Sequence, residues 1–372
     1  MATLSTLFGQ ETAIGALRKA LESDCLPGTY LFLGAPGVGK GAMAQAFAKA
    51  ATCLNPRHAP FDACGGCDSC RRADAGTQPE ILTILPAGEH TQIWQFWERD
   101  NKAGSGALTH TLNYAPGLGR RRVYIVERAD TLTESAANSL LKVLEEPPPY
   151  ALFLLLAPQA ARVLPTIVSR SQLLRLRALP TEELAAYLRD TVGIEAERAG
   201  MLAAYSEGRI GQAMQFAQNP AVSEEINRVL DFAETLPDAP RVRALKIAEQ
   251  MRKLAAQTKA LVGEEPTASA DGGEEGESGG TPKEKAGRRQ LAAVFDLLVA
   301  FYRDLLTLSV SGAEARNLVN RERAVKLARL ARSGSPQRWT ACLDTLLQAR
   351  RRLDANANVA LVTESLAMTL VS

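Results

Sequence analysis

A glycine-rich run near the start of the chain has the residue types of a phosphate-binding loop. Residues 34–41 read GAPGVGKG and follow a short apolar stretch. The pattern G-x-x-x-x-G-K-[ST] holds nucleotide phosphates on backbone N–H groups and a lysine, and its last hydroxyl binds Mg²⁺. The residues suited to phosphate contact are Gly34, Gly37, Gly39 and Lys40. Position 41 is a glycine, so the loop keeps these residues but lacks the metal ligand.

Four of the six cysteines form a second cluster, with the spacing C-x10-C-x2-C-x2-C. They are Cys53, Cys64, Cys67 and Cys70. Zn²⁺ prefers four tetrahedral ligands, and C-x2-C turns present two thiolates to one ion. Because all four ligands come from the protein, the spacing predicts a closed, structural zinc site rather than a catalytic one. The alternative is a vestigial cluster that no longer binds metal.

The strand-like run RVYIV (122–126) ends in Glu127-Arg128. In a nucleotide-hydrolysing site, an Asp-Glu pair at such a strand end would supply a carboxylate near Mg²⁺ and a base for the attacking water. Arg128 cannot act as a base, and it adds positive charge where a metal should lie. A residual role for these two residues and an ordinary solvated strand end are both open.

The composition is that of an ordinary globular protein of 372 residues, enough for two or three domains. Apolar residues make up 46% and charged residues 23%, and the formal net charge is +2. This balance argues against a broad basic surface for nucleic acid, although it permits a local patch. No apolar run approaches the roughly 20 residues of a membrane helix, and the N-terminus does not resemble a secretory signal. We therefore expect a cytoplasmic protein, in which clustered cysteines indicate metal rather than disulfides.

Short apolar runs alternate with helical stretches over residues 1–178, which predicts an α/β domain. The runs are TYLFL (29–33), EILTIL (80–85), RVYIV (122–126), ALFLLLA (151–157) and the less apolar QLLRLRAL (172–179). Near-continuous apolar strands separated by helices indicate a parallel five-stranded sheet covered on both faces, with the last run as an edge strand. The glycine-rich loop would then join the first strand to a helix over Lys40–Ala50, where a helix N-terminus can bind an anion.

The rest of the chain has helical periodicity. Thr181 after Pro180 marks a helix N-terminus, and a small helical module extends to residue 220. Apolar residues at spacings of three and four within 291–308 and 339–353 indicate the core of a helical bundle. Residues 263–289 contain no aromatic or branched aliphatic residue, so we expect this segment to be a disordered linker.

Several motifs together carry a family resemblance. They are GQETAIGAL (9–17), NSLLKVLEEPP (138–148), a four-cysteine module directly after the phosphate-loop helix, and the C-terminal run RRLDANANVALVTESLAMTL (351–370). In these features the chain resembles the AAA+ clamp loader family of bacterial DNA polymerase III, whose subunits open a ring-shaped clamp and place it on DNA. The resemblance implies an AAA+ domain at 1–178 with the zinc module at 53–70, a helical lid at 179–220 and a helical collar at 221–372.

Two kinds of subunit in this family share these features: the ATP-hydrolysing motor (gamma/tau) subunits and the delta prime subunits. The resemblance places four parts of the ATPase site where this chain has other residues. Gly41 stands where the family has the Mg²⁺-binding hydroxyl, and Glu127-Arg128 stands where it has the Asp-Glu pair. Ala157 replaces a polar sensor residue at the end of the fourth strand. Gly211 replaces the lid arginine, for which Arg209 is the alternative source. Because phosphoryl transfer depends on metal and positioning, we expect almost no hydrolysis by this chain. The implied function is a non-hydrolysing stator of the delta prime kind.

The pair Ser169-Arg170 matches the Ser-Arg-Cys stretch of the family, apart from Ser171 in the third place. The resemblance implies that Arg170 is an arginine finger for the nucleotide bound by a neighbouring subunit. A planar, permanently charged guanidinium suits the oxygens of a triphosphate. The alternative is an exposed arginine at a strand start. Whether the phosphate loop of this chain itself binds nucleotide without Mg²⁺ is open.

The resemblance also implies the partners: motor (gamma/tau) subunits and a delta subunit in a heteropentamer, the sliding clamp, and primer–template DNA in the replisome at the nucleoid. One rival function is a motor subunit that hydrolyses ATP with relaxed motifs. Another is a zinc-containing DNA-binding adaptor, for which RRAD (71–74) and GRRRVY (119–124) are the nearby basic clusters. We expect GRRR (119–122) to face solvent at a strand start. Residues 87–118 match the family poorly, and Trp94 and Trp97 suit either core packing or a partner contact.

Overall fold

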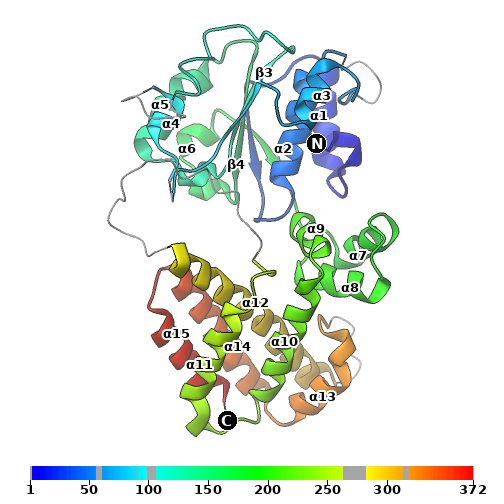
Figure 1. Ribbon diagram of the computed structural model, residues 1–372, viewed down its shortest axis with the longest axis vertical. Helices are drawn as coiled ribbons and strands as arrows, with labels where there is room; N and C mark the ends of the chain where they lie inside the picture. The colour runs from blue at the N-terminus through cyan, green and yellow to red at the C-terminus, as the bar shows by residue number, and fades with distance from the viewer. Residues whose placement is uncertain are drawn as a thin grey trace. The chain divides into compact units, whose positions relative to one another are not determined.

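The computed structural model describes residues 2–55, 61–88, 90–98, 106–262, 282–312 and 318–371 (Figure 1). They form two compact units. The first comprises the described residues of 2–179 and the short segment Arg209–Gly211, and the second comprises those of 180–208 and 212–371. The division of the helical part into a lid and a collar stays a prediction. Residues 263–281 of the segment predicted to be disordered lie outside the described ranges.

The first unit is built on a five-stranded parallel sheet with the order β2-β3-β4-β1-β5. The strands are β1 (Thr29–Leu33), β2 (Ile81–Ile84), β3 (Arg122–Val126), β4 (Ala151–Ala157) and β5 (Gln172–Arg175). This confirms the predicted α/β class with the fifth run at an edge. That strand ends at Arg175 rather than at residue 179, because the backbone of Arg177 bonds to the side-chain amide of Gln10 instead of to the sheet.

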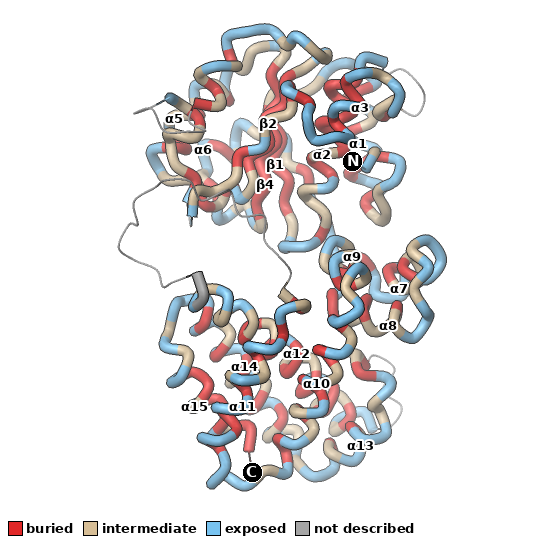
Figure 2. Tube along the Cα trace, viewed as in Figure 1, coloured by how far each residue is buried: buried red, intermediate tan, exposed pale blue. Residues whose placement is uncertain are grey.

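Helices cover both faces of the sheet, as buried parallel strands require (Figure 1). They are α1 (Glu11–Glu22), α2 (Lys40–Thr52), α3 (Asp68–Asp74), α4 (Ile93–Phe96), α5 (Glu134–Glu145) and α6 (Pro165–Val168), with the 3₁₀ turns η1 (Leu4–Thr6), η2 (Ala129–Thr131) and η3 (Ala160–Arg162). Alternate residues of a strand point to opposite faces. Tyr30 and Phe32 of β1 therefore pack with α1 and α2, whereas Leu31 and Leu33 pack with α5 and α6. The resulting two cores flank the strands, whose buried residues are red in Figure 2.

The second unit is entirely helical in its described residues. Its elements are α7 (Thr181–Asp190), α8 (Ala196–Tyr205), α9 (Ile210–Gln218, starting in the segment that groups with the first unit), α10 (Ala221–Thr235), η4 (Arg241–Arg243), α11 (Ala244–Ala256), α12 (Pro282–Ser311), η6 (Arg321–Arg323), α13 (Ala324–Arg332), α14 (Pro336–Asp354) and α15 (Val359–Leu370). The predicted stripes are buried on α12 and α14, which pack against each other; they include Leu298, Phe301, Leu305, Trp339, Cys342 and Leu346. No described helix is long and apolar enough to cross a membrane.

Helix α12 begins at Pro282, inside the segment 263–289 that the composition predicted to be disordered. The prediction is therefore wrong for residues 282–289. Proline is favoured at the first position of a helix, where no intrahelical hydrogen bond is lost. Glu284, Lys285 and Ala286 are good helix formers, and they lead directly into the apolar stripe of the core. Packing of the later turns of α12 thus stabilises helix over residues 282–289, although this stretch has few apolar side chains to bury.

Candidate functional site

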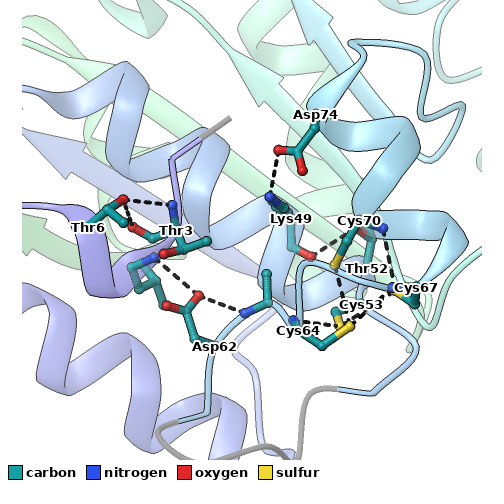
Figure 3. A network of polar contacts seen from close by, with 12 residues as sticks. Thr3, Thr6, Lys49, Thr52, Cys53, Asp62, Cys64, Cys67, Cys70 and Asp74 are labelled. Atoms are coloured by element: carbon teal, nitrogen blue, oxygen red, sulfur yellow. Dashed lines mark hydrogen bonds and ion pairs between the residues drawn. The ribbon is translucent and has the colours of Figure 1, made fainter.

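The four cysteines converge from two segments of the first unit. Cys53 follows the last residue of α2, while the other three lie in the loop before α3 and in its first turn. Their sulfur atoms all lie within 4.8 Å of one another, and the pairs Cys53 with Cys67 and Cys64 with Cys70 are each 3.9 Å apart (Figure 3). An ion with metal–sulfur bonds of about 2.3 Å in a tetrahedron places its sulfur ligands about 3.8 Å apart. The described geometry therefore fits one metal ion bound by four thiolates.

Backbone N–H groups point at the cysteine sulfurs. The amides of Cys64, Cys67 and Cys70 donate to the Sγ atoms of Cys53, Cys64 and Cys67 respectively, each at 3.4 Å. Burial alone would raise the pKa of the Cys67 thiol, but hydrogen bonds, foremost those from the amides of Cys70 and Leu54, lower this pKa to about 6. Such donors stabilise a thiolate, which is the form of cysteine that binds metal.

The module is fixed to the phosphate-loop helix by buried polar contacts. Ser69 Oγ in α3 donates to the carbonyl of Thr52 in α2 at 2.8 Å, and Gln78 Nε2 donates to Ser69 Oγ at 2.5 Å. Lys49 of α2 forms an ion pair with Asp74 of α3, with 2.6 Å between Nζ and Oδ1 (Figure 3). The Lys49 side chain is only 3% exposed, whereas that of Asp74 is 41% exposed. Sequence spacing carried no signal for this pair.

The loop that carries Cys64 also holds the N-terminal segment of the chain. Asp62 is buried, and its carboxylate accepts hydrogen bonds from the amides of Leu4 at 3.1 Å and Ser5 at 2.7 Å. The same carboxylate accepts from the amide of Ala63 at 2.7 Å. Leu4 is fully buried in the core beside α2. The cysteine module and the N-terminal turn η1 therefore form one connected structure (Figure 3).

The ion pair between α2 and α3 leads to a prediction about its two ends. Replacing Asp74 by Asn should lower the free energy of unfolding by about 2–3 kcal/mol, because it leaves the Lys49 ammonium buried without an opposite charge. Replacing Lys49 by Met keeps the packing volume and leaves a half-exposed carboxylate that water can solvate, so we expect a loss of about 1 kcal/mol or less. Urea unfolding measures both values. A larger loss for Lys49→Met than for Asp74→Asn would contradict this account.

The phosphate loop lies between β1 and α2, as predicted. Gly37 and Gly39 have φ angles of +80° and +103°, a backbone region that favours glycine. The Nζ atom of Lys40 donates to the carbonyls of Gly34 at 2.6 Å and Ala35 at 3.0 Å. Burial lowers the pKa of this lysine, while the charges of Glu127 and Asp130 oppose that shift. The loop therefore has the conformation of a phosphate site, and its lysine contacts the loop itself.

The residues beside the loop do not fit a hydrolysable Mg²⁺–nucleotide. A Cβ atom at Gly41 would lie 3.5 Å from Glu127 Oε1. The Glu127 carboxylate is therefore the group nearest to the position that a serine or threonine side chain would occupy. Burial raises the pKa of Glu127, and the charge of Lys40 partly offsets this shift. Arg128, next to it, is exposed and has a left-handed backbone with φ of +54°. The hydroxyl ligand and the water-activating carboxylate of a hydrolytic site are therefore absent from positions 41 and 128.

The two remaining ATPase positions also lack a suitable side chain. Ala157 is fully buried at the end of β4, opposite Leu33 of β1. The amide of Gly211 donates to the carbonyl of Gly37 at 2.8 Å, and a Cβ atom at Gly211 would lie 2.9 Å from that oxygen. This contact lies within the first unit and leaves no room for a side chain at position 211. Arg209 lies in the same short segment.

Arg170 lies at the surface of the first unit, directly after α6. Its amide donates to the carbonyl of Ile167 at 3.2 Å, and the Ser169 hydroxyl donates to that of Thr166 at 3.1 Å. The Arg170 side chain is 33% exposed and is paired with Glu145 of α5. A surface position is compatible with a contact to another subunit and with an ordinary exposed arginine. No spacing pattern indicated the pairing with Glu145, although that residue belongs to the run NSLLKVLEEPP.

Arginines of the basic cluster GRRRVY (119–124) have acidic partners. Arg120 and Arg121 pair with Asp24 at 2.9 and 3.1 Å, and Arg122 pairs with Glu80 at 2.6 Å. Arg122 is only 7% exposed, so the expectation that this cluster faces solvent is wrong for Arg122. The buried carboxylate of Glu80, directly before β2, accepts a hydrogen bond from the Arg122 guanidinium. The same guanidinium donates to the carbonyl of Tyr114 at 2.7 Å.

The two tryptophans, Trp94 and Trp97, lie in and directly after a short helix. Helix α4 ends at Phe96, so Trp97 follows its last residue. Trp97 packs against the core beside α5, and its indole N–H donates to Ser139 Oγ at 3.0 Å. This contact supports the core-packing interpretation for Trp97. The partner-contact interpretation of Trp94 stays a hypothesis.

Comparison with known proteins finds relatives among the subunits of one enzyme. The family described as "DNA polymerase III, delta subunit" matches residues 9–180. The DNA polymerase III subunit delta' of Bacillus subtilis is 26% identical over 364 residues, which cover 97% of this chain and 96% of that protein. Subunit tau/gamma of Haemophilus influenzae is 33% identical over 186 residues, which cover 50% of this chain and 25% of that protein. A solved gamma subunit-related protein of Thermotoga maritima covers 95% of this chain and 96% of its own, at 17% identity and a TM-score of 0.43, values too low to establish a shared fold by themselves.

Proposed function

Because this chain belongs to the AAA+ clamp-loader subunits of bacterial DNA polymerase III, we propose that it is a delta prime-like stator, which does not hydrolyse ATP itself and serves the active site of a neighbouring ATPase subunit. The likeness to a delta' subunit extends over nearly the whole of both chains, whereas the likeness to the tau/gamma subunit covers half of this chain and a quarter of that protein. Full-length likeness supports the delta prime kind over the motor kind.

The observation that carries this proposal is the state of the phosphate loop. Gly41 supplies no hydroxyl for Mg²⁺, and Arg128 stands where an acid would activate water. Gly211 approaches the loop so closely that no lid arginine fits there. Hydrolysis of a nucleotide depends on metal and positioning, so these changes together remove the means of catalysis. Bound nucleotide without turnover remains compatible with Gly34, Gly37, Gly39 and Lys40.

The part of the machinery that this chain would supply is Arg170, next to Ser169. It lies at the surface after α6 and keeps a guanidinium, which pairs with phosphate oxygens through several N–H donors. In this proposal it reaches the nucleotide held by a motor subunit and stabilises the charge that develops during phosphoryl transfer. The motor subunit provides the metal and the attacking water.

The metal bound by Cys53, Cys64, Cys67 and Cys70 is proposed to be a structural zinc ion. Four sulfur ligands at tetrahedral spacing are typical of Zn²⁺ sites without an open position. Such an ion would fix the loop before α3 and, through Asp62, the N-terminal turn. No catalytic role is proposed for it, because no coordination position is left for a substrate.

The remaining parts of the proposal concern the assembly. The helical region would divide into a lid (179–220) and a collar (221–372) that joins motor and delta subunits in a heteropentamer, which loads the sliding clamp on primer–template DNA in the replisome. The rival DNA-binding adaptor is less well supported, because Arg120, Arg121 and Arg122 are engaged by carboxylates of the same unit. A DNA affinity of the isolated chain that falls steeply with salt would favour that rival.

ATP hydrolysis by the chain alone tests the central claim. We expect no Mg²⁺-dependent phosphate release above background, and none from Gly41→Ser, because Arg128 still stands in place of the base. The serine variant should fold, since its Cβ atom would meet Glu127 Oε1 at an ordinary distance of 3.5 Å. Phosphate release is measured with purified chain and with motor subunits as the positive control. Turnover by the unsubstituted chain would support the motor-subunit rival instead.

A further inference from the structure

The guanidinium of Arg170 has a specific partner on its own chain. Its Nε atom donates to Glu145 Oε1 at 2.7 Å, and its Nη2 atom contacts the same oxygen. Glu145 is the last residue of α5. We propose that Glu145 is a positioning residue, which holds the Arg170 guanidinium in the orientation that meets the nucleotide of the neighbouring subunit. This inference rests on the proposed finger role of Arg170.

The backbone around Arg170 is fixed, but the side chain is long. Helix α6 is a single turn that packs against α5, and the Ser171 hydroxyl donates back to the carbonyl of Ile167 at 2.7 Å. An arginine side chain has many rotamers, and its tip can sweep several ångströms around a fixed backbone. A partner near the tip is therefore needed to select one orientation. Glu145 provides that partner through two of the three guanidinium nitrogens.

The contacts leave the guanidinium able to bind an anion. It has five N–H donors, and the described contacts are two to Glu145 and two from Nη1, to the carbonyl of Thr166 at 3.0 Å and to Ser169 Oγ at 3.4 Å. At least one donor therefore stays available. The side chains of Arg170 and Glu145 are 33% and 48% exposed, and exposed ion pairs are weak. A triphosphate can thus join or replace the carboxylate, so Glu145 orients the finger without withholding it.

The location of the carboxylate supports the same conclusion. The C-terminal end of a helix carries partial negative charge, so a carboxylate on the last residue of α5 is unfavourable there by itself. A cation beside it removes the repulsion. Arg170 lies at that helix end and also caps a carbonyl of α6. The negative charge of Glu145 and the positive charge of Arg170 therefore stabilise each other at this helix end. An arginine that pointed into solvent would not gain this stabilisation.

The test is steady-state ATP hydrolysis by the assembly reconstituted with motor and delta subunits, the clamp and primed DNA. Glu145→Ala should lower kcat about tenfold, because misplacement of a positioned group by about 1 Å costs up to 10²-fold. KM for ATP should stay unchanged, since the nucleotide is bound by the neighbouring subunit. Glu145→Gln keeps an acceptor oxygen without the charge, so its kcat should lie between those of Glu145→Ala and of the unsubstituted assembly. The control is Glu146→Ala, because Glu146 is also exposed and adjoins Glu145.

A double substitution separates positioning from a structural effect. If Glu145 acts through Arg170, then Glu145→Ala combined with Arg170→Ala should be no slower than Arg170→Ala alone. Equal turnover for Glu145→Ala, Glu145→Gln and the Glu146→Ala control would overturn the inference while leaving the finger intact. Faster turnover for Glu145→Ala would overturn it too, since the pair would then be a restraint. Normal turnover for Arg170→Ala would instead refute the proposed finger role, and the inference with it.

Discussion

Replacing Arg170 by alanine is expected to slow ATP hydrolysis at the neighbouring site of the assembly by about 10³-fold or more, because an arginine supplied in trans contributes about 10³–10⁵ to the rate of phosphoryl transfer. The guanidinium stabilises charge on the transferred phosphoryl group, and alanine leaves no donor within reach. The chain itself should stay folded, since this side chain lies at the surface and its ion pair is weak. The measurement is kcat of the reconstituted assembly, with the melting temperature of the isolated variant beside it.

Two further variants make this result specific. Arg175→Ala removes another exposed arginine five residues along the chain, at the end of β5, and should leave turnover unchanged. Arg170→Lys keeps the positive charge but loses the planar fork of donors, so we expect most of the defect to persist. The finger role is refuted if Arg170→Ala turns over as fast as the unsubstituted assembly. A defect shared equally by Arg175→Ala would point to general loss of surface charge.

Loss of the metal is expected to have the second large effect. Cys70 is fully buried, and Cys70→Ser should abolish binding of one metal equivalent. We also expect the free energy of unfolding of the first unit to fall by at least about 3 kcal/mol. This is a fraction of the free energy of zinc binding to zinc-finger peptides, which is about 10–16 kcal/mol. For a unit of this size, a loss of about 3 kcal/mol corresponds to a fall in melting temperature of about 6–12 °C. Elemental analysis counts the metal, and calorimetry measures the fall.

The control for the metal prediction is Cys25→Ser, because Cys25 is exposed and lies in the same unit. It should change neither metal content nor melting temperature. Chelation of the unsubstituted chain should also speed hydrogen exchange at the amides of Leu4 and Ser5, which are held by Asp62 in the cysteine-bearing loop. A metal-free chain that melts at the same temperature would show that the four cysteines are not a structural metal site.

Some features of this protein follow from short stretches of sequence. The runs TYLFL, RVYIV and ALFLLLA became β1, β3 and β4 with their predicted bounds, because a short, continuous apolar run rich in branched and aromatic residues suits a strand that is buried on both faces of a parallel sheet. The cysteine spacing predicted the ligand set, because two residues between thiols already bring their sulfurs onto one side of a turn. The missing hydroxyl at Gly41 and the presence of Arg170 are also properties of single positions.

Other features depend on which distant segments meet, and spacing along the chain carries no information about that. The start of α12 at Pro282 was missed because packing of its later turns supports a stretch with little to bury. The burial of Arg122 was missed because its partner Glu80 lies 42 residues earlier in the chain, directly before β2.

The sequence by itself therefore determined three strands with their bounds, a candidate set of four metal ligands and the lack of a hydroxyl at position 41, since each is read from one short run or from residue types and their spacing. Only the tertiary structure decided that Glu145 faces Arg170, that Lys49 meets Asp74, and that Asp62 holds the N-terminal turn. Ion pairs and hydrogen bonds are short-ranged, so a partner is chosen by the packing of helices and strands that brings the two groups within about 3 Å.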